Sequence, residues 1–425
     1  MTQAPGQRPS LPAIVGMFIA TSLAMIGNYY IYDSIGPVAE LLSRQLGWSD
    51  TQIGTLNAIY SFPNIFMVVI GGVLVDRYSA RSVTLITSIV CLIGAVVTAL
   101  GSEFPVMVAG RLLFGLGAET MIVAVTVAFA QWFVGRYFAL LFALNLTAAR
   151  FGSYLADRSP TFASDLYAQG WQPPLWLASA FGALAVAGAL AYWLIDRQEA
   201  ARGTLAIAPP SDRIDWGTLL KFRAEYWFIV GICVTFYSVI FPFRSTFAIK
   251  YFQEGHGLTL EAAGTLNSYV FLAAMFLTPV FGLLVDRIQR HGLLLTLGAL
   301  GLPLSFLVLS SHGTDGLAMA TILLGASYSL VPAVLWPAVA RYCSAEQLGT
   351  AFGLMTALQQ TGVFLANIAA GYVNDRSGAS AANPAGYDAM LWFFGLLSLA
   401  ALVFAMLLLQ RRPREAGLTI GHPQH

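Results

Sequence analysis

The chain has 425 residues, of which 57% are hydrophobic and only 10% charged, and its formal net charge is +1. Soluble domains carry roughly a quarter charged residues and fewer than half apolar ones, so this composition indicates a protein of the lipid bilayer. A near-neutral chain without a basic tract and interleaved aromatic residues gives no reason to expect a nucleic-acid partner. The three cysteines lack the spacing of a disulfide framework or metal site, and we expect neither metal nor cofactor.

Apolar runs recur along nearly the whole chain. A helix needs about 20 residues to cross roughly 30 Å of hydrocarbon. The first run is too long for a cleaved signal peptide and leads directly into another run, so we expect it to be retained. Together the runs predict an all-α membrane protein with twelve transmembrane helices, at 11–42, 51–75, 82–101, 105–132, 137–160, 173–195, 224–251, 259–285, 292–311, 316–341, 346–372 and 388–410.

Basic residues are distributed unequally between the two sides of this predicted arrangement. Lys and Arg in short loops favour the cytoplasmic side of a membrane. Fifteen of them fall on the side that carries both termini and four on the other side. We therefore expect a multi-pass protein whose termini are both cytoplasmic.

A polar stretch at 196–223 separates the runs into two sets of six and predicts a cytoplasmic linker. The two sets repeat each other at an offset of 210 residues, as expected for a duplicated unit. The sequence thus predicts two homologous six-helix bundles, residues 11–195 and 224–410, followed by a cytoplasmic tail at 411–425. The matching residues include Thr55-Leu56-Asn57 with Thr265-Leu266-Asn267, Asp76-Arg77 with Asp286-Arg287, and Gly72, Gly115 and Gly152 with Gly282, Gly325 and Gly362.

The connection between the second and third predicted spans carries a recognisable motif. It reads Gly-Val-Leu-Val-Asp-Arg-Tyr-Ser-Ala-Arg over residues 72–81. In this motif, and in the glycine-rich segment 110–119 of the fourth span, the chain resembles the major facilitator superfamily. The resemblance implies the fold of that superfamily, two pseudo-symmetric bundles of six helices, and transport by alternating access with substrate bound at midplane between the bundles.

The same resemblance assigns a gating role to the motif. Asp76 can lie against a helix N-terminus while Arg77 and Arg81 pair with carboxylates or helix C-termini, in contacts that hold in one conformation only. We expect its second copy, and two charged residues near the outer ends of their helices, to act in the same way. The predicted gating residues are Gly72, Asp76, Arg77, Arg81, Asp286, Arg287, Asp33 and Arg244.

Two charged residues, Glu119 and Arg150, lie deep inside predicted spans. Each is about 12 residues, or roughly 18 Å, from the cytoplasmic end of its helix and so near the bilayer midplane. A charge there costs about 2.5–3.5 kcal/mol, so each should face a partner or a wet cavity. Either the two residues neutralise each other as a structural pair, or they contact the ammonium and carboxylate of a ligand; the sequence leaves both open.

Neutral polar and aromatic residues complete the predicted substrate site. The offset of 210 places Ser329 and Gln360 where the first half has Glu119 and Arg150, so the second half supplies neutral groups. The predicted substrate-binding residues are Glu119, Arg150, Asn57, Tyr60, Tyr30, Asn267, Tyr269, Tyr328, Trp336 and Gln360.

Short blocks further resemble the dipeptide-transporting branch of the superfamily, among them residues 32–37, 60–64, 149–153 and 335–337. That resemblance implies a dipeptide or similar small zwitterion as substrate, with Glu119 and Arg150 contacting it. A proton-coupled carrier of monocarboxylates or other small organic anions is the alternative, and protons are a candidate partner in either case. No nucleophile with a base and no metal motif stands near midplane, so we expect no enzyme. We expect a monomer in a bacterial inner membrane.

Overall fold

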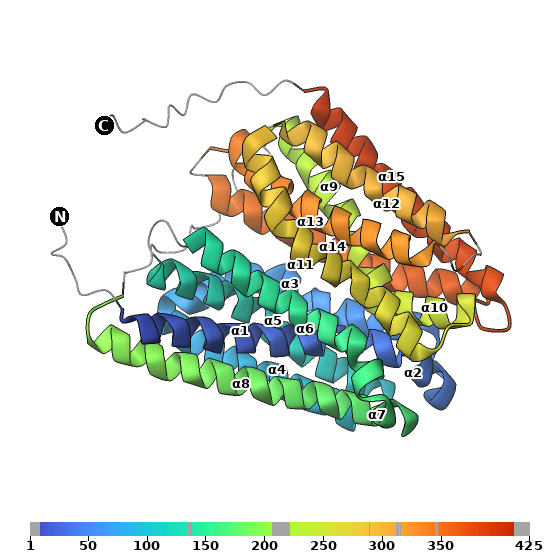
Figure 1. Cartoon of the computed structure of the whole chain (residues 1–425), viewed down its shortest axis with the longest axis horizontal. Coiled ribbons are helices and arrows are strands. Elements are labelled where there is room, and N and C mark those ends of the chain that lie inside the picture. Colours follow the sequence, from blue (N-terminus) through green and yellow to red (C-terminus); the bar gives the residue numbers. More distant parts are fainter. Residues whose placement is uncertain are drawn as a thin grey trace.

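The computed structural model of the chain describes residues 9–133, 138–205, 222–288, 290–311, 314, 316–344 and 347–411. Long helices follow one another from end to end (Figure 1). The first half contains α1 (Leu11–Asp33), η1 (Gly36–Val38), α2 (Ala39–Leu46), α3 (Asp50–Tyr78), α4 (Ala80–Leu100), α5 (Phe104–Trp132), α6 (Phe138–Phe162), α7 (Ser164–Ala168) and α8 (Gln172–Ala201). The second contains α9 (Ala224–Pro242), η3 (Phe243–Phe247), α10 (Ala248–His256), α11 (Leu260–Ile288), α12 (His291–Leu309), α13 (Leu317–Tyr342), α14 (Leu348–Ser377), η5 (Pro384–Tyr387) and α15 (Asp388–Leu409).

Each predicted span coincides with a long helical stretch. Among the described residues nine helices are long and apolar enough to cross a membrane. Helix α3 bends by 62° between Met67 and Ile70 and is a tenth if its two parts count as one span. Helices α6 and α14 are more polar because they bury Asn145 and Asp157, and Asn367 and Asn374, between helices. Most of the predicted linker, residues 206–221, and all but Arg411 of the predicted tail lie outside the described residues.

Two spans predicted as continuous helices are broken. Span 11–42 ends as α1 at Asp33 and resumes as η1 and α2, while span 224–251 passes through the π-helical turn η3 between α9 and α10. The sequence Gly36-Pro37 accounts for the first break, because proline disfavours a helical conformation in the residue before it. A π-helical turn inside an α-helix is frequent at functional sites. The breaks lie near the 210-residue offset from each other, so they belong to the repeat.

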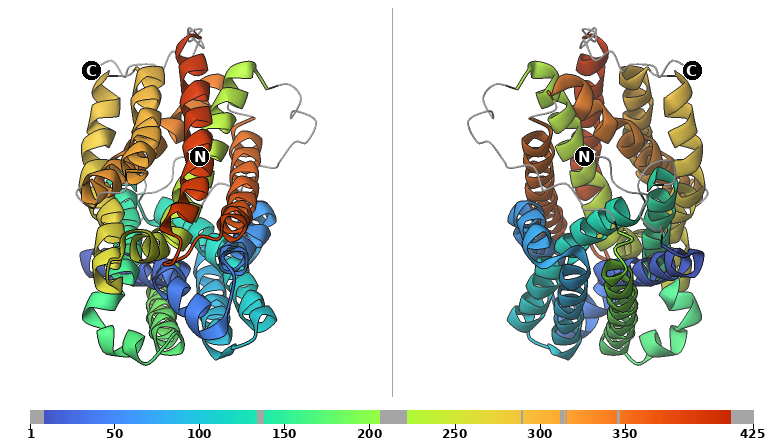
Figure 2. Two further views of the ribbon diagram at one scale, coloured as in Figure 1. Left: turned by 90° about the vertical axis from the view of Figure 1, so that its right-hand side faces the viewer. Right: turned by 90° about the vertical axis from the view of Figure 1, so that its left-hand side faces the viewer.

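The helices form two bundles that meet along two helix pairs. Helix α3 packs against α14 and α6 against α11, while α1, α4, α5 and α8 pack together within the first half. Figure 2 shows the two halves one above the other, with the two helix pairs at the boundary. In Figure 1 the bundles diverge toward the beginning of α1 and the end of α15.

Close backbone contacts confirm the repeat in three dimensions. A Cβ atom added at Gly54 of α3 would lie 2.3 Å from the carbonyl oxygen of Asn367 in α14. At an offset of 210, a Cβ at Gly264 of α11 would lie 2.3 Å from the carbonyl oxygen of Asp157 in α6. Only glycine allows helices to approach this closely. The same offset relates two contacts inside the bundles, Gly115 against Tyr60 and Gly325 against Val270.

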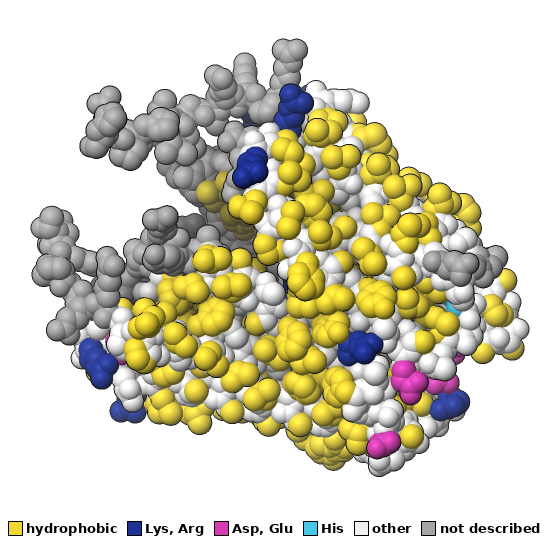
Figure 3. All heavy atoms as spheres, viewed as in Figure 1, with side chains coloured by type: hydrophobic (Ala, Val, Ile, Leu, Met, Phe, Trp, Pro, Cys, Tyr) yellow, Lys and Arg dark blue, Asp and Glu magenta, His cyan; other side chains and the backbone are white. Residues whose placement is uncertain are grey.

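The outer surface fits a bilayer. Figure 3 shows hydrophobic side chains over most of one face, with charged side chains gathering toward the two ends of the helices. Large apolar residues such as Phe276, Leu307 and Trp392 are 68–72% exposed. Such a surface would be costly in water and is stable against hydrocarbon.

Candidate functional site

A small cavity lies between the two bundles. Helices from both halves form its walls, which are aromatic and polar. The lining residues are Asn28, Tyr29 and Tyr32 of α1, Tyr60 of α3, Glu119 of α5, Phe241 of α9, and Gln360 and Val363 of α14.

Glu119 presents a carboxylate to this cavity from the first bundle. Its Oε1 accepts one hydrogen bond from the Tyr60 hydroxyl at 3.3 Å and one from Gln360 Nε2 at 3.2 Å. Tyr60 belongs to the same bundle, whereas Gln360 belongs to the other. The carboxylate therefore bridges the bundles through neutral donors, and no described salt bridge involves it.

Arg150 reaches the second bundle at a different place. Its guanidinium donates to the carbonyl oxygen of Ala274 at 3.2 Å and to the Thr278 hydroxyl, both in α11. It also lies 5.4 Å from the ring centroid of Tyr328 in α13, a cation–π contact. All three partners are neutral, so the charge of Arg150 is solvated by dipoles.

Glu119 and Arg150 do not form an ion pair in the described structure, which excludes the structural pair that the sequence left open for this conformation. The reason is geometric, because each side chain extends across the bundle boundary to a different helix of the second half. Tyr29 of α1 lines the same cavity as Glu119. The two opposite charges are thus held apart, each with neutral hydrogen-bond partners among the described residues.

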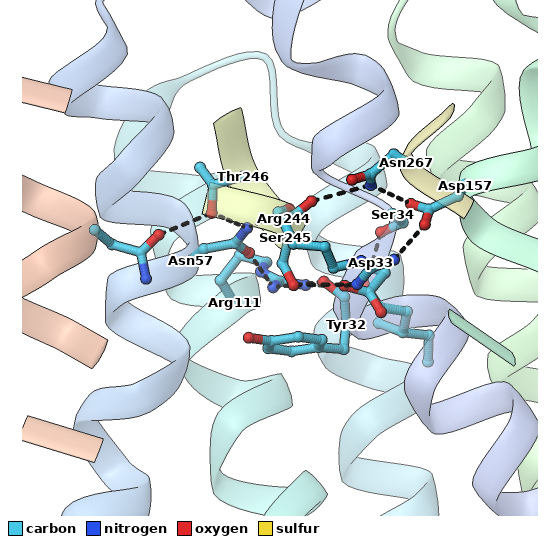
Figure 4. A network of polar contacts seen from close by, with 12 residues as sticks. Tyr32, Asp33, Ser34, Asn57, Arg111, Asp157, Arg244, Ser245, Thr246 and Asn267 are labelled. Carbon is cyan, nitrogen blue, oxygen red and sulfur yellow. Dashed lines mark hydrogen bonds and ion pairs between the residues drawn. The ribbon is translucent and has the colours of Figure 1, made fainter. Parts of the chain in front are cut away.

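Next to the cavity, a buried network joins the bundles. Arg244 of η3 donates from Nη1 to Asp33 and from Nη2 to Asp157 Oδ2 at 2.5 Å, and all three side chains are at most 2% exposed (Figure 4). Asn267 donates to Asp157 Oδ1 at 2.9 Å and to the Arg244 carbonyl oxygen at 3.0 Å. The Arg244 guanidinium also lies 3.9 Å from the ring centroid of Phe271. We call Asp33, Asp157, Arg244 and Asn267 the inter-bundle network.

A second set of polar contacts closes the end of the molecule away from the start of α1. Lys250 of α10 pairs with Asp50, the first residue of α3, and donates to the Ser43 hydroxyl at 2.9 Å. Asp375, near the end of α14, accepts from the backbone N–H groups of Asp50 and Thr51 at 2.8 and 2.9 Å. A carboxylate from one bundle therefore caps the N-terminus of a helix of the other, where the helix dipole favours negative charge.

The Major Facilitator Superfamily model matches residues 17–259 and 243–424, which is nearly the whole chain. The chain belongs to the Major Facilitator Superfamily. It is therefore a multi-pass membrane transporter of a small molecule and not an enzyme.

Similar proteins agree with this membership. The chain is 30% identical to the lysosomal dipeptide transporter MFSD1 of Homo sapiens over 440 residues, covering 99% of this chain and 92% of that protein. It is 21% identical to the probable sulfoacetate transporter SauU of Cupriavidus necator, covering 92% and 93% of the two chains. The crystal structure of the nucleoside transporter NupG has a TM-score of 0.70 at 14% identity, covering 93% of this chain and 100% of that one. An inward-facing, unoccupied bacterial homolog of the human lysosomal transporter Spinster has a TM-score of 0.69 at 14% identity, covering 94% and 96%.

In this member of the superfamily the signature loop is a single residue, Ser79, between α3 and α4, and its φ of 72° is unusual for a residue with a side chain. Arg81 pairs with Asp196 of α8 at 3.2 Å, a contact inside the first bundle. Arg77 lies 5.3 Å from the ring of its neighbour Tyr78. In the second copy Arg287 is exposed, and the side chain of Asp286 is outside the described residues.

Several predicted substrate residues have protein partners in the described conformation. Tyr30 stacks on Phe181 of α8 at 3.8 Å, because α1 turns this side chain into its own bundle. Asn57 donates to the carbonyl oxygen of Ser245 and the hydroxyl of Thr246 in η3, and Asn267 donates to the carbonyl oxygen of Arg244. Trp336 donates to the Tyr237 hydroxyl at 3.4 Å within the second bundle. Tyr269 is half-buried on α11.

Two functional candidates were missed by the sequence reasoning. Asp157 stands three residues before the end of a predicted span, where carboxylates are common. Only its contact with Arg244 in the structure indicates a function. Arg111 was interpreted only as part of a glycine motif. Its guanidinium, 1% exposed, donates to the carbonyl oxygens of Ile31 and Tyr32 at 3.1 Å, where α1 breaks, and to Asn57 Oδ1 at 2.5 Å. A cation at a helix C-terminus is favoured by the helix dipole.

Proposed function

We propose that the chain carries dipeptides or similar small zwitterions across the membrane by alternating access. The observation that carries this proposal is the separation of Glu119 and Arg150, two opposite charges with only neutral hydrogen-bond partners among the described residues, of which Glu119 lines the cavity. A zwitterion has one ammonium and one carboxylate and can satisfy both at once with charge-assisted hydrogen bonds. The similarity to the human lysosomal dipeptide transporter supports the same substrate class.

The described conformation has a natural place in such a cycle. The hydrogen bonds described between the bundles run from the level of Glu119 and Arg150 to the end that carries Asp50 and Asp375. With both termini in the cytoplasm, as the basic residues predict, that closed end faces outward and the conformation faces inward. We propose residues 11–195 and 224–410 as the two moving bodies of a monomer in a bacterial inner membrane.

The test is counterflow of a labelled dipeptide into proteoliposomes by the wild type, Glu119→Gln and Arg150→Gln. Because hydrogen bonds to charged groups are worth about 1.5–3 kcal/mol, each variant should lose roughly 10- to 100-fold in apparent affinity. Glu103→Gln, an exposed carboxylate at the start of the same helix α5, and Arg197→Gln, an exposed arginine of α8, are the matched controls. Retention of wild-type affinity in both cavity variants would overturn the proposal.

A second candidate is transport of a small organic anion, favoured by the contact of Arg150 with neutral groups only and by the similarity to the probable sulfoacetate transporter. A thermal-shift panel of dipeptides, amino acids and monocarboxylates separates the two, because a bound ligand stabilises the native state. Stabilisation by monocarboxylates and not by dipeptides, with loss in Arg150→Gln alone, would establish the anion carrier instead.

A further inference from the structure

Asn28 of α1 is a buried polar residue in the cavity wall that the site described above leaves without a role. Its side chain is 2% exposed, and it lines the cavity together with Glu119, Tyr60 and Gln360. In the described part of the chain its Oδ1 atom is buried and has no hydrogen-bond partner. Native proteins rarely leave a buried amide oxygen unpaired, because its lost hydration is not replaced. The missing partner of Asn28 is therefore best sought in the cavity.

The position of Asn28 defines which part of a ligand it would meet. Asn28 lines the same cavity as Glu119, whose carboxylate would meet the ammonium of a bound zwitterion. In a dipeptide one carbon atom separates the ammonium from the peptide group, so a ligand anchored at Glu119 places its middle beside the anchor. The middle of a dipeptide is its peptide group. That group has one N–H donor and one C=O acceptor, and the asparagine amide has the complementary acceptor and donors.

We propose that Asn28 hydrogen-bonds the peptide group of the substrate and thereby distinguishes dipeptides from other zwitterions of the same length. This inference rests on the proposed function and deepens it. Which amide atom faces the ligand does not change the outcome, because either orientation offers the peptide group a partner. A site built to bond a polar group rejects an analogue that lacks it more strongly than an apolar pocket rejects a missing methylene, since the protein group is then left unpaired.

The proposal predicts an affinity order for three ligands with equally spaced charges. Glycylglycine has the complete peptide group, 5-aminolevulinate keeps the C=O and replaces the N–H by CH₂, and 5-aminopentanoate has neither. Competition against a labelled dipeptide in proteoliposomes should rank them in this order. The first and last should differ by about 10- to 100-fold, the value expected for an unpaired buried polar group. Equal affinity of the unmodified protein for glycylglycine and 5-aminopentanoate would overturn the proposal without any variant.

The variant Asn28→Leu sharpens the test. It should weaken the binding of glycylglycine by about 10-fold or more and leave the affinity for 5-aminopentanoate within about threefold of the wild-type value, so that the preference for glycylglycine is lost. Asn145→Leu is the matched control, because Asn145 is a buried asparagine of α6 that bonds to Ser22 and also has an unpaired Oδ1. It should keep the wild-type order. Asn28→Ala, which removes the amide without adding a branched side chain, substitutes if the leucine variant does not fold.

The outcomes separate the two proposals. If the unmodified protein does not bind glycylglycine at all, the dipeptide function itself fails. If glycylglycine binds but Asn28→Leu weakens all three ligands equally, the dipeptide function stands and the role of Asn28 in reading the peptide group is wrong.

Discussion

The cavity region and the inter-bundle network contain the same kinds of charged side chain but use them for different purposes. In the network Arg244 contacts two carboxylates directly, and all three groups are at most 2% exposed. At the cavity Glu119, and near it Arg150, are half-buried and contact neutral groups alone among the described residues. A buried ion pair holds one arrangement of the bundles, because separation leaves unpaired charges, whereas charges kept apart remain available to a ligand. Geometry, more than residue type, thus separates a contact that closes the protein from one that binds.

The largest expected effect comes from breaking the network. Arg244→Met removes the cation between Asp33 and Asp157, and loss of one partner of a buried pair costs about 3–5 kcal/mol, which lowers the population of the conformation closed at this end by roughly 10²- to 10⁴-fold relative to the open one. The reporter is Ser34→Cys, a near-isosteric change at a buried position beside the network (Figure 4), in a background without the three native cysteines. A membrane-impermeant thiol reagent should label it much faster in the Arg244 variant.

The control for this experiment is Arg197→Met, which removes an exposed arginine. The labelling rate should stay at the wild-type value in that variant. Unchanged labelling in Arg244→Met would show that the network is dispensable for closure.

An intermediate effect is expected from the two interface glycines. A methyl group at Gly54 or Gly264 would lie 2.3 Å from a carbonyl oxygen of the facing helix, so α3 and α14, or α6 and α11, must separate by about an ångström or more. Both alanine variants should raise the labelling of the Ser34→Cys reporter and slow counterflow by about 10-fold, the size of a 1–3 kcal/mol overpacking cost. Gly395→Ala, where an added Cβ meets nothing within 4 Å, is the control. An effect in only one of the pair would contradict the symmetric contact.

The smallest effect is expected at Asp375. Partial burial acts to raise the pKa of this carboxyl, but the hydrogen bonds from the hydroxyl and N–H of Thr51 and the N–H of Asp50 outweigh it and lower the pKa. Because this pKa is depressed, the Asp375 carboxylate contributes fully to closure at pH values above the ordinary aspartate pKa of about 4. The contribution is lost as the pH falls below that value. Asp375→Asn should weaken the helix cap by about 1 kcal/mol at neutral pH, a roughly fivefold rise in labelling. The variant should also lack the acid-induced rise that the wild type shows.

The fold could be predicted from the sequence, and the contacts of the site only in part. Apolar length and the 210-residue repeat locate every span, because both are properties of the linear chain. Glu119 and Arg150 stand out because a charge in hydrocarbon is anomalous wherever its helix faces. Their partners depend on helix rotation, which the pattern does not specify; Tyr30, predicted to bind substrate, stacks on Phe181 of α8 in this structure. Gly36-Pro37 was a usable signal for the broken first span.

The two broken helices have a consequence for the surrounding lipid. Beyond the breaks, α2 and α10 contain only eight and nine residues, and at 1.5 Å per residue each is about 12–14 Å long. As the two bundles rock, we expect these short segments to pivot at η1 and η3 and so to keep their depth in the bilayer while the long parts of α1 and α9 tilt with their bundles. Such pivots would reduce the hydrophobic mismatch that rocking creates. Turnover should accordingly depend less on acyl-chain length than in a protein whose corresponding helices are unbroken.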